Sequence, residues 1–133
     1  MSLFLRVVGA GLAAAALSYL LNRVFLSRFG KYAFIYIAPV MEEGLKTIFA
    51  LGLNVPVVLA HTVFGLIEGT HDLFPFQEKK VAAFLVSLLS HTVFGALTWL
   101  IFVYSSSLAL SVALVSAFHI LWNYSVFKIL KSF

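Results

Sequence analysis

The sequence has no cysteine, only three prolines, and few charged residues, which make up 11% of its 133 positions. The absence of cysteine excludes disulfides and thiol catalysis. A soluble domain usually has about 25% charged and roughly 45–50% apolar residues, whereas 62% of this chain is hydrophobic. A chain of this length cannot hide so much apolar surface from water, so we predict that it folds within a lipid bilayer.

Five segments are long and apolar enough to cross a bilayer, which requires about 20 mostly apolar residues each. They cover residues 4–26, 32–53, 56–74, 81–104 and 107–130. The first has no convincing cleavage site after it, so we expect a helix rather than a signal peptide. Pro56 is well placed to begin the third helix. The sequence therefore predicts an all-α, polytopic membrane helical bundle of about five transmembrane helices, with residues 1–133 forming a single domain.

Lysine and arginine are distributed unequally between the two ends of these segments. One side carries Arg23, Arg28, Lys31, Lys79, Lys80, Lys128 and Lys131, whereas the other carries only Arg6. The net charge of +4 is therefore interpreted as a signal of membrane topology, and we expect no nucleic-acid partner. The positive-inside rule predicts a multi-pass protein of the cell membrane, with its N-terminus outside and its C-terminus in the cytoplasm.

Polar and ionisable side chains also lie inside the apolar segments: Glu42, Glu43, Lys46, His61, Glu68, His91, His119 and Asn123. A charge at the bilayer centre costs about 2.5–3.5 kcal/mol on insertion scales, so such residues need partners and usually have a function. Counting about 1.5 Å of rise per residue brings polar groups from four helices to the middle or cytoplasmic half of the bilayer. The same count places His61 nearer the outer side, where we expect a packing or hydrogen-bonding role.

Helical spacing predicts two pairs among these residues. Lys46 follows Glu42 by four positions and Glu43 by three, so one carboxylate can neutralise its ammonium group. The other carboxylate is left for a different task. His119 and Asn123 are four positions apart and share a helix face, and a partner amide or carboxylate fixes the tautomer of a histidine.

The five residues His-Thr-Val-Phe-Gly occur twice, at positions 61–65 and 91–95. The flanking sequences do not match. We interpret the repetition as a coincidence in an apolar chain of low diversity, or as the trace of an old duplication.

Four short motifs follow one another along the chain: Glu42-Glu43-Gly44-Leu45-Lys46, Phe64-Gly65-Leu66-Ile67-Glu68, Ser90-His91-Thr92-Val93-Phe94 and His119-Ile120-Leu121-Trp122-Asn123. In this order, each in its own predicted helix, they resemble the motifs of the PrsW family of intramembrane endopeptidases. That family is related to the CAAX prenyl endopeptidases and to bacteriocin-processing membrane proteases. The resemblance covers residues 42 to 123 and implies hydrolysis of peptide bonds in membrane-anchored proteins or peptides.

The resemblance also implies which residues carry the reaction: Glu42, Glu43, Glu68, His91, His119 and Asn123, supported by Lys46. A desolvated carboxylate is a competent general base near neutral pH. Glu42, ahead of Glu43, is expected to deprotonate a water molecule in a cavity near mid-bilayer.

Two arrangements of the remaining residues fit this chemistry. In the first, Glu68 and His91 hold the water, while His119 and Asn123 donate hydrogen bonds to the oxyanion. In the second, Glu68, His91 and His119 bind Zn²⁺, because catalytic zinc commonly takes three His or Glu ligands and a water. The sequence lacks the H-E-x-x-H signature of many zinc peptidases. Both arrangements stay open at this point.

Two other functions compete with proteolysis. Intramembrane Glu, His and Lys also form proton or ion paths in transport proteins, and such a path would use His61 as its outer step. An inactive adaptor that keeps the protease fold is the other alternative. Five short helices are few to shield a wet site from lipid, so a homo-oligomer is a further expectation.

Overall fold

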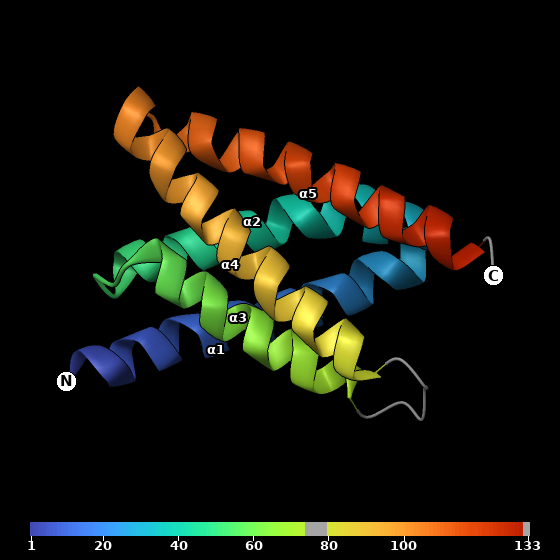
Figure 1. The fold of residues 1–133 in the computed structure, drawn as a ribbon, viewed down its shortest axis with the longest axis horizontal. Helices are drawn as coiled ribbons and strands as arrows, with labels where there is room; N and C mark the ends of the chain where they lie inside the picture. The colour runs from blue at the N-terminus through green and yellow to red at the C-terminus, as the bar shows by residue number, and fades with distance from the viewer. Residues whose placement is uncertain (74–79, 132–133) are drawn as a thin grey trace.

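The computed structural model describes residues 1–73 and 80–131, which form helices and no strands (Figure 1). The elements are α1 (Leu3–Phe29), the π-helical segment η1 (Ala33–Ile37), α2 (Ala38–Gly52), α3 (Val57–Asp72), α4 (Lys80–Ser105) and α5 (Leu108–Lys131). The predicted all-α class is confirmed, and the five long helices coincide with the five predicted segments. The predicted end of the third segment, residue 74, lies outside the described residues.

Turn chemistry sets the helix boundaries at most of the predicted breaks. Gly30 ends α1 with φ of +54°, a conformation that glycine adopts without a steric penalty. Pro56 directly precedes α3, as predicted. Ser107 begins α5, because its hydroxyl accepts the backbone N–H of Leu110 at 3.3 Å. The first break is shorter than predicted, since α1 continues to Phe29, past the predicted end at residue 26.

The π-helical segment η1 leaves a backbone group without its usual partner. In this register the N–H of Ala38 donates to the carbonyl of Ala33, five residues earlier. The next bond in the series would run from residue 39 to Phe34, but Pro39 has no N–H. The side-chain amide of Asn123 on α5 donates to the Phe34 carbonyl instead, at 3.1 Å. A proline in η1–α2 thus explains a contact that joins α5 to this segment.

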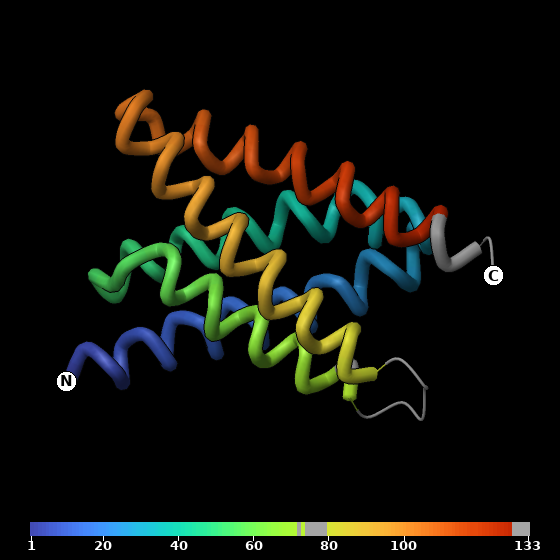
Figure 2. Tube along the Cα trace, viewed as in Figure 1, coloured from blue at the N-terminus to red at the C-terminus, as the bar shows by residue number. Residues whose placement is uncertain are grey.

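The long helices run back and forth along the longest dimension of the molecule, so the two termini lie at opposite ends (Figures 1 and 2). Arg28 and Lys31 flank the turn after α1, Lys80 begins α4 and Lys128 lies near the end of α5. These positions all belong to the end of the bundle where the C-terminus lies. Lys79, which also entered the topology prediction, lies outside the described residues.

Large apolar side chains are exposed and some charged side chains are buried, which is the reverse of the usual arrangement in a soluble protein. Large apolar side chains are exposed along the helices, including Ile48, Leu89 and Leu100, whereas Glu43 and Lys46 are 0% exposed. Within the part of the chain that the structure describes, three helices are long and apolar enough to cross a membrane: Leu3–Phe29, Lys80–Ser105 and Leu108–Lys128. A contiguous apolar surface of this kind suits contact with lipid.

A buried apolar group closes the end of the bundle at which the N-terminus lies. It consists of Val7, Ala10, Ala50, Val55, Val57 and Ala60, contributed by α1, α2, α3 and the turn between α2 and α3. In α1, α2 and α3 the polar side chains of the interior therefore begin beyond this apolar group, whereas α4 and α5 carry the buried polar side chains Thr98 and Ser111.

Candidate functional site

Every long helix contributes a polar side chain to one group inside the bundle. We call it the polar cluster, and it consists of Asn22 (α1), Glu42, Glu43 and Lys46 (α2), His61 and Glu68 (α3), Ser87 and His91 (α4) and His119 (α5). Its members are joined by hydrogen bonds and ion pairs. The predicted convergence of polar groups from separate helices is therefore confirmed.

Glu43 is the centre of the polar cluster. Its Oε1 accepts from the ammonium of Lys46 at 2.6 Å and from Nδ1 of His119 at 2.9 Å. Its Oε2 accepts from Nε2 of His61 at 3.0 Å. The prediction that one carboxylate of the pair neutralises Lys46 is confirmed. Because all these partners already surround Glu43, this carboxylate is suited to hold the site together rather than to react.

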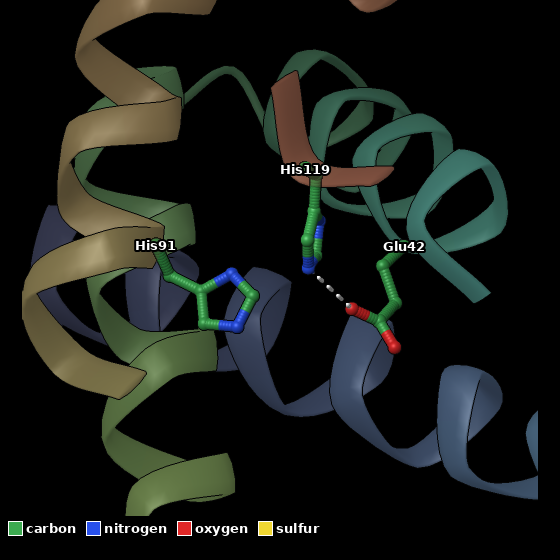
Figure 3. A group of neighbouring side chains, drawn as sticks. All are labelled: Glu42, His91 and His119. Carbon is green, nitrogen blue, oxygen red and sulfur yellow. Dashed lines mark ion pairs between the residues drawn. The ribbon is translucent and has the colours of Figure 1, made fainter. Parts of the chain in front are cut away.

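Glu42 is the second carboxylate, and one of its oxygens has no hydrogen-bond partner among residues 1–73 and 80–131. Its Oε1 accepts from Nδ2 of Asn22 at 2.9 Å. Its Oε2 lies 3.9 Å from Nε2 of His119 (Figure 3). Since Nδ1 of His119 carries the hydrogen that is donated to Glu43, Nε2 presents its lone pair toward Glu42. Glu42 and His119 thus face each other as two acceptors.

The separation of these two acceptors has a chemical consequence. It is too long for a direct hydrogen bond. Two hydrogen bonds of about 2.8 Å that meet at roughly a right angle join atoms about 4 Å apart. The geometry therefore suits a single water molecule held between Glu42 and His119.

Glu68 and His91 form the part of the polar cluster that is nearest the surface. Lys46 donates to Nδ1 of His91 at 3.0 Å, so the other ring nitrogen, Nε2, carries a hydrogen and donates to Oε2 of Glu68. The Ser87 hydroxyl donates to the same oxygen at 3.0 Å. The side chain of Glu68 is 41% exposed, against 7% or less for Glu42 and Glu43. Among the described carboxylates of the cluster, Glu68 marks the side that is open.

The residues that converge as candidate metal ligands differ from the predicted set. Glu42, His91 and His119 have ligand atoms within 4.8 Å of one another (Figure 3), so Glu42 takes the place that the sequence assigned to Glu68. Both nitrogens of His91 already have partners, and one of these partners is the ammonium of Lys46.

The spacing of the ligand atoms also disfavours a zinc site in this arrangement. Two ligands at about 2.0–2.1 Å from a tetrahedral Zn²⁺ lie roughly 3.3–3.4 Å apart, closer than the 3.9 Å between Glu42 and His119. Together with the occupied nitrogens of His91, this means that the donor set does not fit Zn²⁺ without rearrangement.

Asn123 does not lie with His119 in the polar cluster, although the two share a helix. Its amide donates to the Phe34 carbonyl of η1, while His119 contacts Glu42 and Glu43. The expected pairing of His119 with Asn123 is wrong, because η1 leaves a carbonyl that the amide satisfies. The predicted role of Asn123 in binding an oxyanion has no support from this arrangement.

Three members of the polar cluster, Asn22, His61 and Ser87, were not predicted as site residues. His61 was expected to have a packing or hydrogen-bonding role nearer the outer side; it does form hydrogen bonds, and one of them reaches Glu43 at the centre of the polar cluster. The depth count used only the helical rise and assumed parallel helices, whereas α3 diverges from α2 in Figure 1. Asn22 lies within the first predicted segment but was not among the candidate site residues; in the structure it lies in α1 and contacts Glu42. The signal that could have identified Asn22 is its amide side chain within an otherwise apolar helical segment.

Comparisons with protein-family models, with curated proteins and with solved structures find no match to this chain. The resemblance to the PrsW family therefore rests on the motif residues and remains a prediction.

Proposed function

We propose that this chain is an intramembrane endopeptidase that hydrolyses peptide bonds of membrane-anchored proteins or peptides. The observation that carries the proposal is the pair of facing acceptors, Glu42 and His119, spaced for one water inside a bundle with an apolar surface. Hydrolysis needs a base beside a positioned water. The motif order along the chain, which resembles that of PrsW endopeptidases, supports the same reaction.

The proposed reaction starts with a water that donates one hydrogen to Glu42 and the other to Nε2 of His119. Both lone pairs of its oxygen remain free to attack the scissile carbonyl carbon. As the C–O bond forms, Glu42 takes one proton from the water. When the C–N bond breaks, the protonated Glu42 gives this proton to the leaving nitrogen. The products are a carboxylic acid and an amine, and Glu42 returns to its starting state.

Neighbouring residues prepare this pair for the reaction. Asn22 holds the other oxygen of Glu42, which fixes the direction of the reactive one. Glu43 accepts the Nδ1 hydrogen of His119, which keeps the lone pair on Nε2. Preorganised groups of this kind lower the cost of reaching the transition state.

The proposed setting is the cell membrane, crossed five times, with the C-terminal end of the bundle in the cytoplasm. The basic positions at that end support this orientation. Glu68, the exposed carboxylate of the polar cluster, lies in the C-terminal half of α3, which points toward the same end. A substrate would therefore enter from the cytoplasmic side or laterally from the inner leaflet.

The test is cleavage of a panel of single-pass peptides by purified protein in liposomes. Wild-type protein is expected to cleave at least one of them, and Glu42→Gln to lose at least 99% of that activity, because removing a general base costs about 10²–10⁴-fold. Glu78→Gln makes the same chemical change in the sequence between α3 and α4 and is expected to keep full activity. Equal activity of Glu42→Gln and wild type would refute the assignment.

Transport is the second candidate, and the position of His61 favours it. Hydrogen bonds connect Glu68 through His91, Lys46 and Glu43 to His61, as a proton path would require. His61 is 0% exposed, however, and Val57 and Ala60 beside it belong to the apolar group that closes this end. A path that ends at an apolar layer favours a site with one entrance.

Labelling with a thiol reagent distinguishes the two candidates, and the lack of native cysteine removes any background. A Glu42→Cys variant in sealed vesicles is exposed to a membrane-impermeant methanethiosulfonate from each side in turn. The protease reading predicts labelling from the cytoplasmic side only. Labelling from both sides would favour transport.

A further inference from the structure

The two copies of His-Thr-Val-Phe-Gly pack against each other where α3 crosses α4. A Cβ atom added to Gly95 would lie 2.7 Å from Cβ of His61, and one added to Gly65 would lie 2.8 Å from Cβ of His91. The hydroxyls of Thr62 and Thr92 are 3.2 Å apart. Each histidine therefore lies on the glycine of the other copy, with the threonines between them.

This reciprocal packing explains why the same five residues occur twice. Two antiparallel helices that cross closely are related by an approximate two-fold axis, so one sequence can satisfy both sides of the crossing. Each side needs a glycine to let the backbones approach and places a histidine over it. Whether the repeat arose by coincidence or by an old duplication stays open, but in the fold each copy supplies the glycine against which the histidine of the other copy packs.

The crossing directs both histidines into the polar cluster, where each meets its own glutamate. His91 donates to Glu68, and His61 donates to Glu43 at 3.0 Å. The second ring nitrogen of His61, Nδ1, lies 2.9 Å from the Val57 carbonyl. Both partners are acceptors, so a neutral His61 donates to one of them; with its hydrogen on Nε2 it donates to Glu43, and the residue has no exposed surface.

The hydrogen bond from His61 to Oε2 fixes the orientation of the Glu43 carboxylate. Oε1 of Glu43 holds His119 and Lys46, but His61 is the donor to Oε2. Without that donor, Oε2 would be a buried charged oxygen with no partner, which is costly. The carboxylate would then turn toward another donor, and its hold on Nδ1 of His119 would weaken.

We propose that His61 is a positioning residue of the hydrolytic site, acting through Glu43 to fix the tautomer and the orientation of His119. His61 does not touch the reacting atoms in this account. The kinetic consequence rests on the proposed function, whereas the effect on His119 is independent of it. The repeated motif thus gives α3 and α4 each a histidine that serves the site through a glutamate.

The test compares His61→Gln with His61→Asn, because each amide replaces one nitrogen of the ring. The amide nitrogen of glutamine can occupy the place of Nε2 and donate to Glu43. Asparagine is one carbon shorter, so its amide reaches the place of Nδ1 beside the Val57 carbonyl but not Glu43. Comparing the two variants therefore separates the contact of residue 61 with Glu43 from its contact with the Val57 carbonyl.

Two readouts are required, and only one of them depends on catalysis. In ¹⁵N-histidine spectra, His119 is expected to keep its Nδ1–H signal in His61→Gln and to lose it, or shift it, in His61→Asn. In the cleavage assay, kcat of His61→Asn is expected to fall about 10–100-fold, as for other residues that orient a catalytic group. His61→Gln is expected to stay within about threefold of wild type, and KM to change little in either variant.

The outcomes separate this proposal from the proposed function. If His61→Asn leaves both the His119 signals and kcat unchanged, His61 does not position His119. If both variants lose the folded state, or lose activity with unchanged His119 signals, His61 has only a packing role and the proposal is overturned. If wild-type protein cleaves nothing, the proposed function fails, and the His119 signals alone decide the positioning role.

Discussion

The buried pair of Lys46 and Glu43 gives the sharpest prediction about stability. Both side chains are 0% exposed, and their charged atoms are 2.6 Å apart. Removing one partner of such a pair costs about 3–5 kcal/mol because the other charge remains buried, whereas replacing both is close to neutral. We therefore expect Lys46→Met to lower the free energy of unfolding by about 3–5 kcal/mol. The double variant Lys46→Met/Glu43→Gln is expected to regain more than half of that loss.

The assay is reversible unfolding in mixed detergent micelles, evaluated as a double-mutant cycle. Lys31→Met is the matched control, because it makes the same change at an exposed lysine outside the polar cluster. This control is expected to leave the unfolding midpoint almost unchanged. Strictly additive effects of the two single substitutions would show that Lys46 and Glu43 are not coupled, and the ion pair at the centre of the site would be refuted.

Three further predictions address packing, the π-helical segment and metal. Gly95→Ala is expected to destabilise the protein by about 1–3 kcal/mol because its Cβ would overlap His61. Gly44→Ala is the control and is expected to be neutral or stabilising, because the space around Gly44 is open. Equal effects of the two substitutions in thermal unfolding would contradict the reciprocal packing. Asn123→Ala is expected to lower thermal stability but keep activity above half of wild type, and selective loss of activity would restore its role at the oxyanion. Mass spectrometry of protein purified without chelator is expected to find well under one zinc per chain, and a full equivalent would require the polar cluster to rearrange around an ion.

The features that follow from spacing along one helix were predictable from the sequence. Apolar runs and turn residues such as Pro56 predicted the five helices. The spacing of Lys46 from Glu42 and Glu43 predicted that one of the two carboxylates would pair with it, and the structure shows that Glu43 is the partner. The spacing did not say which carboxylate stays available; the resemblance put Glu42 ahead, and among the described residues Oε2 of Glu42 has no hydrogen-bond partner, since Nε2 of His119 lies 3.9 Å away.

The features that depend on how helices meet were not predictable in this way. His61 seemed too shallow to join the site, because helical rise says nothing about crossing angles or the length of two facing side chains. Asn123 seemed paired with His119, because nothing in the pattern shows that η1 adopts π-helical turns ahead of Pro39 and leaves a carbonyl for it. Asn22 was not predicted as a site residue, because nothing in the sequence shows that α1 brings its amide against Glu42.

The measurement that tests the central claim most directly is product analysis in water enriched in ¹⁸O. A cleaved peptide is digested with wild-type protein and with Glu42→Gln, and the new termini are identified by mass spectrometry. Activation of water by Glu42 predicts one ¹⁸O atom in the new C-terminal carboxylate, a cleavage point within or beside the membrane segment, and no such product from Glu42→Gln. The same labelled product from Glu42→Gln at the wild-type rate would contradict the account, because hydrolysis would then proceed without the carboxylate that faces His119.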